Sequence, residues 1–175
     1  MEFEEVIKKR RSVRKFKQKE ISDEKILEIL RLAQLAPSAG NLQAYRVKII
    51  KNEETRKKIS AATYMTLKDG MQEWIFNAPA ILVICADPKE SEARYTERGR
   101  DLYSVQDATI FASYLQLVLT SMGLASTWVG AFHEEDLKKM LNIPEDLKIV
   151  ALIPFGYSDE KTEPRERKKV VEILL

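Results

Sequence analysis

The chain has 175 residues, the size of a single domain, and 45% of them are hydrophobic, which allows a complete core and excludes wholesale disorder. Its 29 basic and 27 acidic residues leave a formal net charge of +2, too little to attract nucleic acid or an anionic membrane strongly. The single cysteine excludes an internal disulfide, and no apolar run reaches the ~20 residues of a membrane span. We expect one soluble, cytoplasmic domain over residues 1–175.

The N-terminal part of the chain carries two helical patterns. Apolar residues at helical spacing predict a short helix within the first ten residues. Ser22 is a suitable N-cap for a second helix, which Pro37 is expected to end. The apolar face of this second helix is expected at Ile26, Leu27, Leu30 and Ala33.

The next segments predict two strands with a helix between them. Residues 45–51 alternate as a strand does, and residues 53–62 return to a helical pattern. Residues 80–85 are apolar on both faces, which is typical of a strand at the centre of a sheet.

Residues 104–122 predict the most apolar helix of the chain. Apolar side chains occupy almost its whole circumference, so it must be covered on most sides. A partner subunit can supply that cover, which points to a homodimer with this long helix at its interface. Burial within a single domain explains the pattern equally well.

The remaining segments complete an α+β pattern. A strand over 126–129 leads to Gly130 and Ala131, a short helix covers 133–141, and residues 149–155 predict a second buried strand. Helices and strands alternate throughout, so we expect a central mixed β-sheet flanked by helices.

The C-terminal region divides into a charged and an apolar part. Residues 158–169 can bury almost nothing and must form an exposed excursion, whereas residues 170–174 are apolar again. An isolated apolar tail of this kind can add a strand to a neighbouring sheet. We expect residues 158–175 to extend onto the partner subunit.

Several kinds of site are excluded by residue counts. His133 is the only histidine, and its position at a predicted helix start indicates a surface cap residue rather than a catalytic base. One histidine and one cysteine cannot form a zinc or iron–sulfur cluster, so no metal is expected. The six glycines form neither a dinucleotide-binding fingerprint nor a phosphate-binding loop. A bound phosphate must therefore be held mainly by side chains.

Four short motifs could hold a ligand, although each alone also fits an ordinary solvated face, connector or packing position. Arginines bind phosphate oxygens in pairs, and serine adds a neutral donor; such donors are Arg10, Arg11, Ser12 and Arg14. A tight loop after a proline presents backbone and amide groups suited to the edge of a heteroaromatic ring, as do Pro37, Ser38, Ala39 and Asn41. A Gly-Ala pair at a strand end admits a flat ligand, at Gly130 and Ala131. Late basic residues could close on a phosphate, at Arg165 and Arg167.

Taken together and in this order, the motifs resemble the nitroreductase family of flavoproteins. The resemblance runs from RRSVRKF through APSAGNLQ and GLASTWVGAF to PFGYSDEKTEPRERKK, and so covers nearly the whole chain. It implies a homodimer with two FMN sites at the subunit interface. Arg10, Arg11, Ser12 and Arg14 then match the residues at the FMN phosphate and the pyrimidine side of the ring, and Arg14 or Arg11 would stabilise the reduced flavin.

The resemblance assigns the other motifs as well. Pro37, Ser38, Ala39 and Asn41 match a loop that approaches the flavin from the other subunit. Gly130 and Ala131 match the backbone at flavin N5, where the Gly130 amide would support the chemistry, and Arg165 and Arg167 match late contacts to the phosphate. Two departures are the Gln43-Ala44-Tyr45 continuation of the loop and the region Thr63–Trp74, which matches no pattern well and offers Gln72 as one contact.

The implied activity is an FMN-dependent oxidoreductase reaction, because the flavin supplies its own redox chemistry and needs no catalytic side chain. The expected course is ping-pong hydride transfer from NADH or NADPH through flavin N5 to a small electron-poor acceptor such as a nitroaromatic or a quinone. Two alternatives stay open. The first is a flavoprotein of the same fold with another role, such as dehalogenation, dehydrogenation or flavin storage. The second is a small basic binding module without a redox cofactor.

Overall fold

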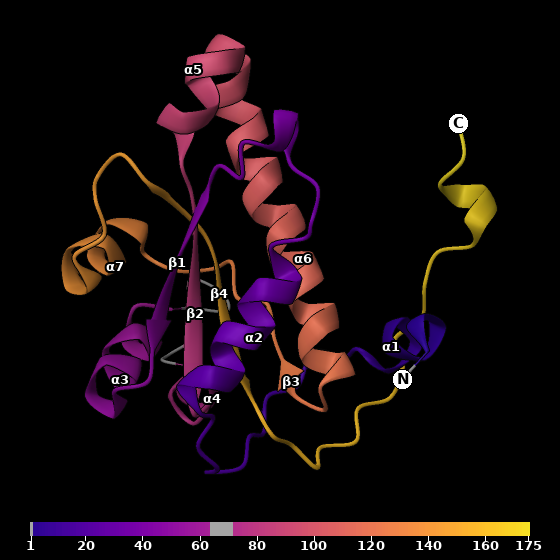
Figure 1. Cartoon of the computed structure of the whole chain (residues 1–175). Coiled ribbons are helices and arrows are strands. Elements are labelled where there is room, and N and C mark those ends of the chain that lie inside the picture. The colour runs from indigo at the N-terminus through magenta and orange to yellow at the C-terminus, as the bar shows by residue number, and fades with distance from the viewer. Residues whose placement is uncertain (1, 64–71) are drawn as a thin grey trace.

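The computed structural model describes residues 2–63 and 72–175, and Figure 1 shows how their helices and strands are arranged. Labels α and β mark helices and strands, and η marks 3-10 or π-helical turns. In chain order these elements are α1 (Phe3–Lys9), α2 (Asp23–Ala33), η1 (Ala39–Asn41), β1 (Tyr45–Ile50), α3 (Glu53–Ala61), α4 (Glu73–Phe76), β2 (Ala80–Ala86), α5 (Pro88–Arg98), η2 (Gly99–Tyr103), α6 (Ser104–Ser121), β3 (Ala125–Ser126), α7 (Glu134–Leu141), β4 (Lys148–Gly156) and η3 (Val170–Glu172).

The named strands form one sheet in the order β1-β2-β4-β3, and every pair of neighbours is antiparallel. The expected α+β class and the central buried strand at residues 80–85 are confirmed. The sheet is not mixed in the expected sense, because the parallel pairing within the described residues is a single bridge between Ser12 and Ser126 at the β3 edge.

The central strand β2 separates two hydrophobic cores. Successive side chains of a strand point to opposite faces, so Leu82 and Ile84 pack with α2 and α6 on one face. Ile81 and Val83 pack with α3 and α7 on the other face. All seven residues of β2 are buried as a result, which explains its uninterrupted apolar sequence. Figure 1 shows the two helical layers on either side of the sheet.

Helix α6 confirms the expected long apolar helix and is only partly covered by its own chain. Phe111, Leu115 and Leu119 are buried against the sheet, while Tyr114 on another side is 41% exposed. The partial cover leaves room for a second subunit without requiring one. Among the described residues, no helix is long and apolar enough to cross a membrane.

The second helix begins as expected, but its face and its end differ from the prediction. The Ser22 hydroxyl accepts the Lys25 amide, which confirms the N-cap. Leu27 is 48% exposed and Ile29 is buried instead, so the apolar face is rotated from the expected one. The helix ends at Ala33 and tightens into i+3 turns before Pro37, because a residue preceding proline disfavours helical geometry.

Three C-terminal and central segments also differ from expectation. The strand expected over 126–129 is reduced to β3, and Val129 rejoins the sheet through an isolated bridge to Leu152. Helix α5 was not predicted, although Asp87 as N-cap and Pro88 in the first turn are sequence signals for it. The apolar tail ends in the turn η3 rather than a strand, and its apolar side chains are at least 66% exposed.

Candidate functional site

The basic segment from Arg10 to Arg14 is extended and bound along the edge of the sheet. The Val13 amide donates to the Ser126 carbonyl over 3.1 Å, and the Thr127 hydroxyl donates to the Val13 carbonyl. Val13 is buried between them, which fixes the residues on either side of it. The backbone of this motif is therefore held in place at Val13, a buried apolar residue within a charged run.

Three arginines from opposite ends of the sequence share one neighbourhood. Burial lowers the pKa of the Arg10 guanidinium, and the positive charges of Arg167 and Arg11 lower it further. Within the described residues no carboxylate forms an ion pair with these three side chains, and the buried Nε of Arg11 has no hydrogen-bond partner. Uncompensated guanidinium groups of this kind suit a phosphate, which accepts several charge-assisted hydrogen bonds.

Arg14 lies farther along the same segment and faces a different neighbour. Its guanidinium carbon lies 5.4 Å from the centre of the Trp74 ring, a cation–π arrangement. The amides of Arg14 and Lys15 both donate to Oε2 of Glu160, over 2.7 and 2.9 Å. Glu160 belongs to the charged excursion, so the start of that excursion is held against the basic segment. No sequence pattern predicted this contact between Glu160 and the basic segment.

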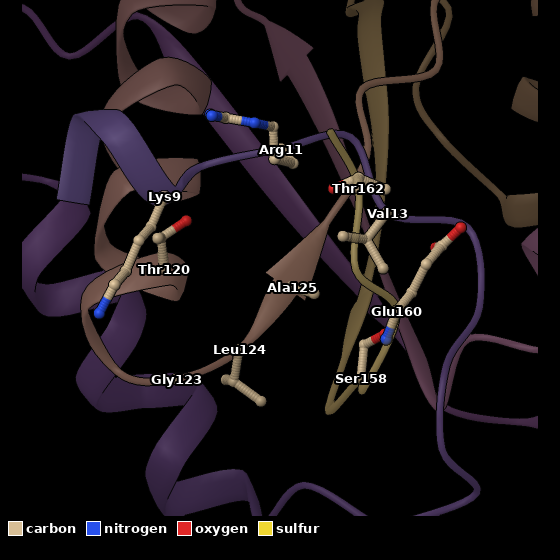
Figure 2. A pocket seen from close by; sticks show the side chains of 10 residues that line it. All are labelled: Lys9, Arg11, Val13, Thr120, Gly123, Leu124, Ala125, Ser158, Glu160 and Thr162. Carbon is tan, nitrogen blue, oxygen red and sulfur yellow. The ribbon is translucent and has the colours of Figure 1, made fainter. Parts of the chain in front are cut away.

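A surface pocket of about 350 Å³ opens beside the basic segment, between the end of α6 and the 158–162 segment. Figure 2 shows Lys9 and Arg11 on one side of it and Ser158 and Glu160 on the other. Arg11 is the one predicted ligand residue in its lining. The pocket therefore adjoins the arginine cluster without enclosing the predicted site.

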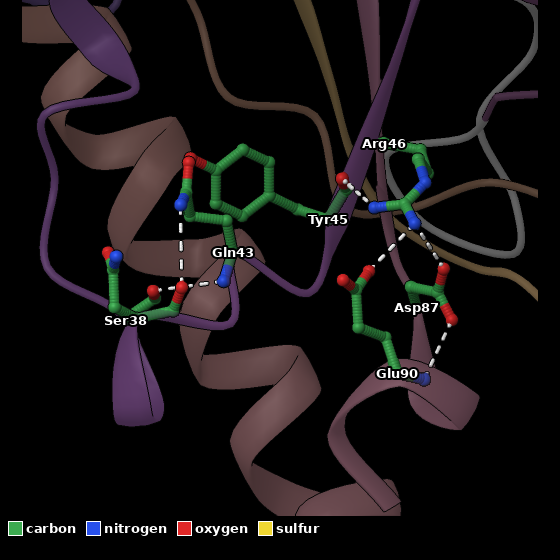
Figure 3. A network of polar contacts seen from close by, with 7 residues as sticks. Ser38, Gln43, Tyr45, Arg46, Asp87 and Glu90 are labelled. Atoms are coloured by element: carbon green, nitrogen blue, oxygen red, sulfur yellow. Dashed lines mark hydrogen bonds and ion pairs between the residues drawn. The ribbon is translucent and has the colours of Figure 1, made fainter. Parts of the chain in front are cut away.

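The loop predicted to approach a ring system has an unusual backbone. Gly40, Asn41 and Gln43 all have positive φ, at 54°, 58° and 52°. The Ser38 hydroxyl accepts the Gln43 amide over 3.0 Å, which closes the loop on itself (Figure 3). Pro37 and Asn41 are exposed, while Ser38 and Ala39 are half-buried.

This loop and the arginine cluster lie at opposite ends of α6. The Ala39 amide donates to Oδ1 of Asp107, in the first turn of the helix. The basic segment instead meets β3, which follows the end of the helix at Ser121. The 14 residues from Asp107 to Ser121 correspond to about 21 Å of helix. One chain therefore does not bring the two predicted halves of the site together.

The other predicted residues occupy a range of positions. Gly130 is exposed beside the Trp128 indole, and Ala131 is half-buried. Arg165 and Ser12 are exposed, whereas Gln72 is 8% exposed and so offers little surface to a ligand. The rest of the Thr63–Trp74 region, residues 64–71, lies outside the described residues. Within the described ranges no group of three His, Cys, Asp or Glu side chains could hold a metal ion.

Comparison with known proteins identifies relatives over most of the chain. The profile of the Nitroreductase family matches residues 7–72 and 64–157. An Archaeoglobus fulgidus protein, provisionally named NADH dehydrogenase/NAD(P)H nitroreductase, is 36% identical over 157 residues, which cover 87% of this chain and 83% of the relative.

Two solved structures have the same fold. A nitroreductase family protein from Clostridium novyi NT is 34% identical with a TM-score of 0.80, covering 91% of this chain and 87% of the other. An FMN-dependent nitroreductase from Clostridium difficile R20291 is 29% identical with a TM-score of 0.76, covering 92% of this chain and 90% of the other. The extent of these matches and the shared fold show that the chain belongs to the nitroreductase family.

Proposed function

We propose that this protein is an NAD(P)H-dependent FMN oxidoreductase, active as a homodimer, that passes a hydride from the nicotinamide through flavin N5 to a small electron-poor acceptor. Its family membership and the names of its relatives support the cofactor and the reaction class. The observation that carries the proposal is the cluster of Arg10, Arg11 and Arg167. These charges come from both ends of the sequence and have no carboxylate counterpart among the described residues.

The residues of the chain have distinct tasks in this proposal. Arg10, Arg11 and Arg167 would bind the FMN phosphate, with the exposed hydroxyl of Ser12 as a further donor. Arg14, whose guanidinium lies against the Trp74 ring, would place positive charge near the ring system of the flavin. The exposed backbone at Gly130 leaves room for a flat ring to approach. FMN, when bound, supplies the redox chemistry.

The geometry of a single chain supports the proposed dimer. The loop Pro37–Asn41 lies about 21 Å of helix away from the arginine side of the fold. A second subunit can bring its own loop to the flavin held by the first, and can cover the exposed side of α6. The exposed apolar tail would then pack on that subunit. Of the expected extension 158–175, only the part from Val170 onward would reach the partner, because Glu160 and Arg167 stay beside the basic segment of their own chain.

An absorbance spectrum of the purified protein, followed by anaerobic addition of NADH and then of NADPH, tests the proposal. We expect the bands of bound oxidised flavin, bleached by at least one of the two donors. Protein that binds no flavin after incubation with FMN would contradict the proposed function. Bound flavin that neither donor bleaches would retain the cofactor and reject NAD(P)H as its reductant.

A further inference from the structure

Asp107 is a buried carboxylate with a hydrogen-bond partner for only one of its two oxygens. It is 2% exposed in the first turn of α6, and its Oδ1 accepts the Ala39 amide over 2.8 Å. Its Oδ2 is buried without a hydrogen-bond partner. Burial raises the pKa of this carboxyl, and the amides of Ala39 and Ala44 oppose part of the rise. An acidic group kept under such conditions calls for a structural reason.

The reason lies in the loop that Asp107 holds. Asn41 and Gln43 adopt positive φ, a backbone region that residues with a side chain rarely occupy. Such a conformation persists only where the surroundings determine it from several sides. The loop therefore needs anchors outside itself to keep this shape.

The described structure supplies three such anchors, two from α5 and its N-cap and one from α6. The Arg94 guanidinium of α5 donates to the Gly40 carbonyl over 3.2 Å, at the exposed side of the loop. The Asp87 amide donates to the Ala44 carbonyl over 2.9 Å, where the loop enters β1. Asp107 provides the third contact and, unlike Arg94, is fully inside the protein, where hydrogen bonds to a charged acceptor are strongest.

Ala39 is also one of the loop residues proposed to face the ligand. Ser38 and Asn41 flank it, and a shift at Ala39 moves both of them together. A displacement of about 1 Å is enough to weaken a ligand-binding arrangement markedly. The carboxylate of Asp107 thus fixes the position of a surface that it does not itself reach.

We infer that Asp107 is a positioning residue that holds the Ser38–Asn41 loop in the shape needed to contact the flavin of the partner subunit. This inference rests on the proposed function, because the flavin and the dimer come from that proposal. It assigns a role in cofactor binding to a side chain buried away from the cofactor.

Three single variants separate positioning from general stability. Asp107→Ala removes the acceptor and should weaken FMN binding by about tenfold to a hundredfold. Asp107→Asn keeps a carbonyl oxygen for the Ala39 amide and should restore most of that affinity. Ser104→Ala is the matched control, because Ser104 is fully buried in the same helix but bonds Arg100 of η2 instead of the loop. It should leave FMN affinity unchanged.

A mixed dimer supplies a second measurement, the number of FMN molecules bound per heterodimer, which a merely structural role of Asp107 would not change. Differently tagged Asp107→Ala and Arg10→Ala chains are refolded together, and the heterodimer is isolated through both tags. One of its sites then carries both defects, whereas the other combines an intact Arg10 with an intact loop. We expect one FMN per heterodimer at wild-type affinity, although each parent homodimer binds FMN weakly.

The outcomes distinguish the inference from the proposal beneath it. Wild-type protein that binds no FMN overturns the proposed function. Wild-type protein that binds FMN while Asp107→Ala binds it equally well overturns the role of Asp107 alone. A heterodimer without a recovered site also overturns that role, since the damage would then stay within the altered chain.

Discussion

The two ends of α6 adjoin different kinds of surface, each of which is proposed to contact the flavin. At the end near β3, three arginines gather whose side chains form no ion pair with a carboxylate among the described residues, and two of them, Arg10 and Arg11, lie on a segment fixed by the burial of Val13. At the other end, a loop of small and amide residues is held by Asp107 in a strained backbone shape. The first surface carries uncompensated positive charge, whereas the second is a backbone held in one conformation.

The difference shows how two surfaces can be divided between subunits. A charged anchor tolerates small shifts, because a guanidinium on a long side chain can follow a phosphate. A backbone surface cannot adjust in this way and must be built in advance. The rigid helix α6 keeps the charged surface and the loop surface apart in one chain. In the proposed dimer, the two surfaces would come together only when the second subunit is bound. The predictions below test each end against the other.

The largest expected effect is at the charged end. Arg10→Ala should weaken FMN binding by on the order of 1.5–3 kcal/mol, the usual contribution of a hydrogen bond to a charged group. Titration of the apoprotein with FMN, followed by flavin fluorescence, measures the loss. The affinity of the wild-type protein should also fall with salt more steeply than that of the variant.

Two residues of the tail give a matched pair for this test. Arg167 contributes to the field at Arg10, whereas the structure gives no such coupling for Arg165, two residues earlier. Arg167→Ala should therefore lower FMN affinity more than Arg165→Ala does. Equal losses of FMN affinity would show that the tail acts through its overall charge. A larger loss for Arg165→Ala would contradict the cluster of Arg10, Arg11 and Arg167.

A smaller effect is expected at the conformational end, from Gly40→Ala. Alanine in the left-handed region costs about 1–2 kcal/mol. The new Cβ would also meet the Tyr95 hydroxyl and lie 2.7 Å from Nη1 of Arg94, so these side chains must shift and the Arg94 hydrogen bond to the Gly40 carbonyl would be disturbed. We expect lower FMN affinity together with a lower free energy of unfolding.

Gly123, at the opposite end of α6, is the control for Gly40. Its φ is 73°, and a Cβ there would meet nothing within 4 Å. Gly123→Ala should thus cost a similar free energy of unfolding in a denaturant titration while FMN affinity stays near the wild-type value. If both variants lose FMN equally, the loop at Gly40 has no special part in binding.

The two ends also differ in how far sequence alone could predict them. The arginines and the buried strand β2 were predictable, because charge and uninterrupted apolar sequence are local properties of a few residues. The contact of Asp107 with the loop was not, since an acidic residue in a helix is ordinarily solvated and its partner Ala39 lies 68 residues earlier. The contact from Glu160 to the Arg14 amide spans 146 residues and was missed for the same reason.

Element boundaries differed from the prediction for a local reason at α2 and for a tertiary reason at β3. Pro37 was expected to end α2, but the chain had already turned after Ala33. The strand expected over 126–129 shares its hydrogen bonds with the basic segment and with β4, which leaves only a short regular pairing. The first difference arises from the local turns before Pro37, whereas the second concerns a segment whose partners come from distant parts of the chain.

The smallest expected effect concerns Tyr45, next to the conformational end. Its ring stacks on Phe111 with centroids 4.3 Å apart, and its buried hydroxyl has no hydrogen-bond partner. Burial and the charge of Asp107 both raise the pKa of this hydroxyl. Tyr45→Phe should therefore change the free energy of unfolding by less than about 1 kcal/mol and can even stabilise the protein, because it removes an unsatisfied buried group.

Tyr157→Phe provides the comparison, because the Tyr157 hydroxyl accepts Lys25 Nζ over 3.2 Å and its loss should cost about 0.5–1.5 kcal/mol. If denaturant titration instead gives the larger loss for Tyr45→Phe, its hydroxyl must have a partner in solution. The Oδ2 of Asp107 is a candidate, since it too is buried without a partner and its charge acts on the Tyr45 hydroxyl; a bridging water would join the two groups. The carboxylate would then be satisfied on both oxygens, and its contact with the loop would belong to a network instead of being a single hydrogen bond.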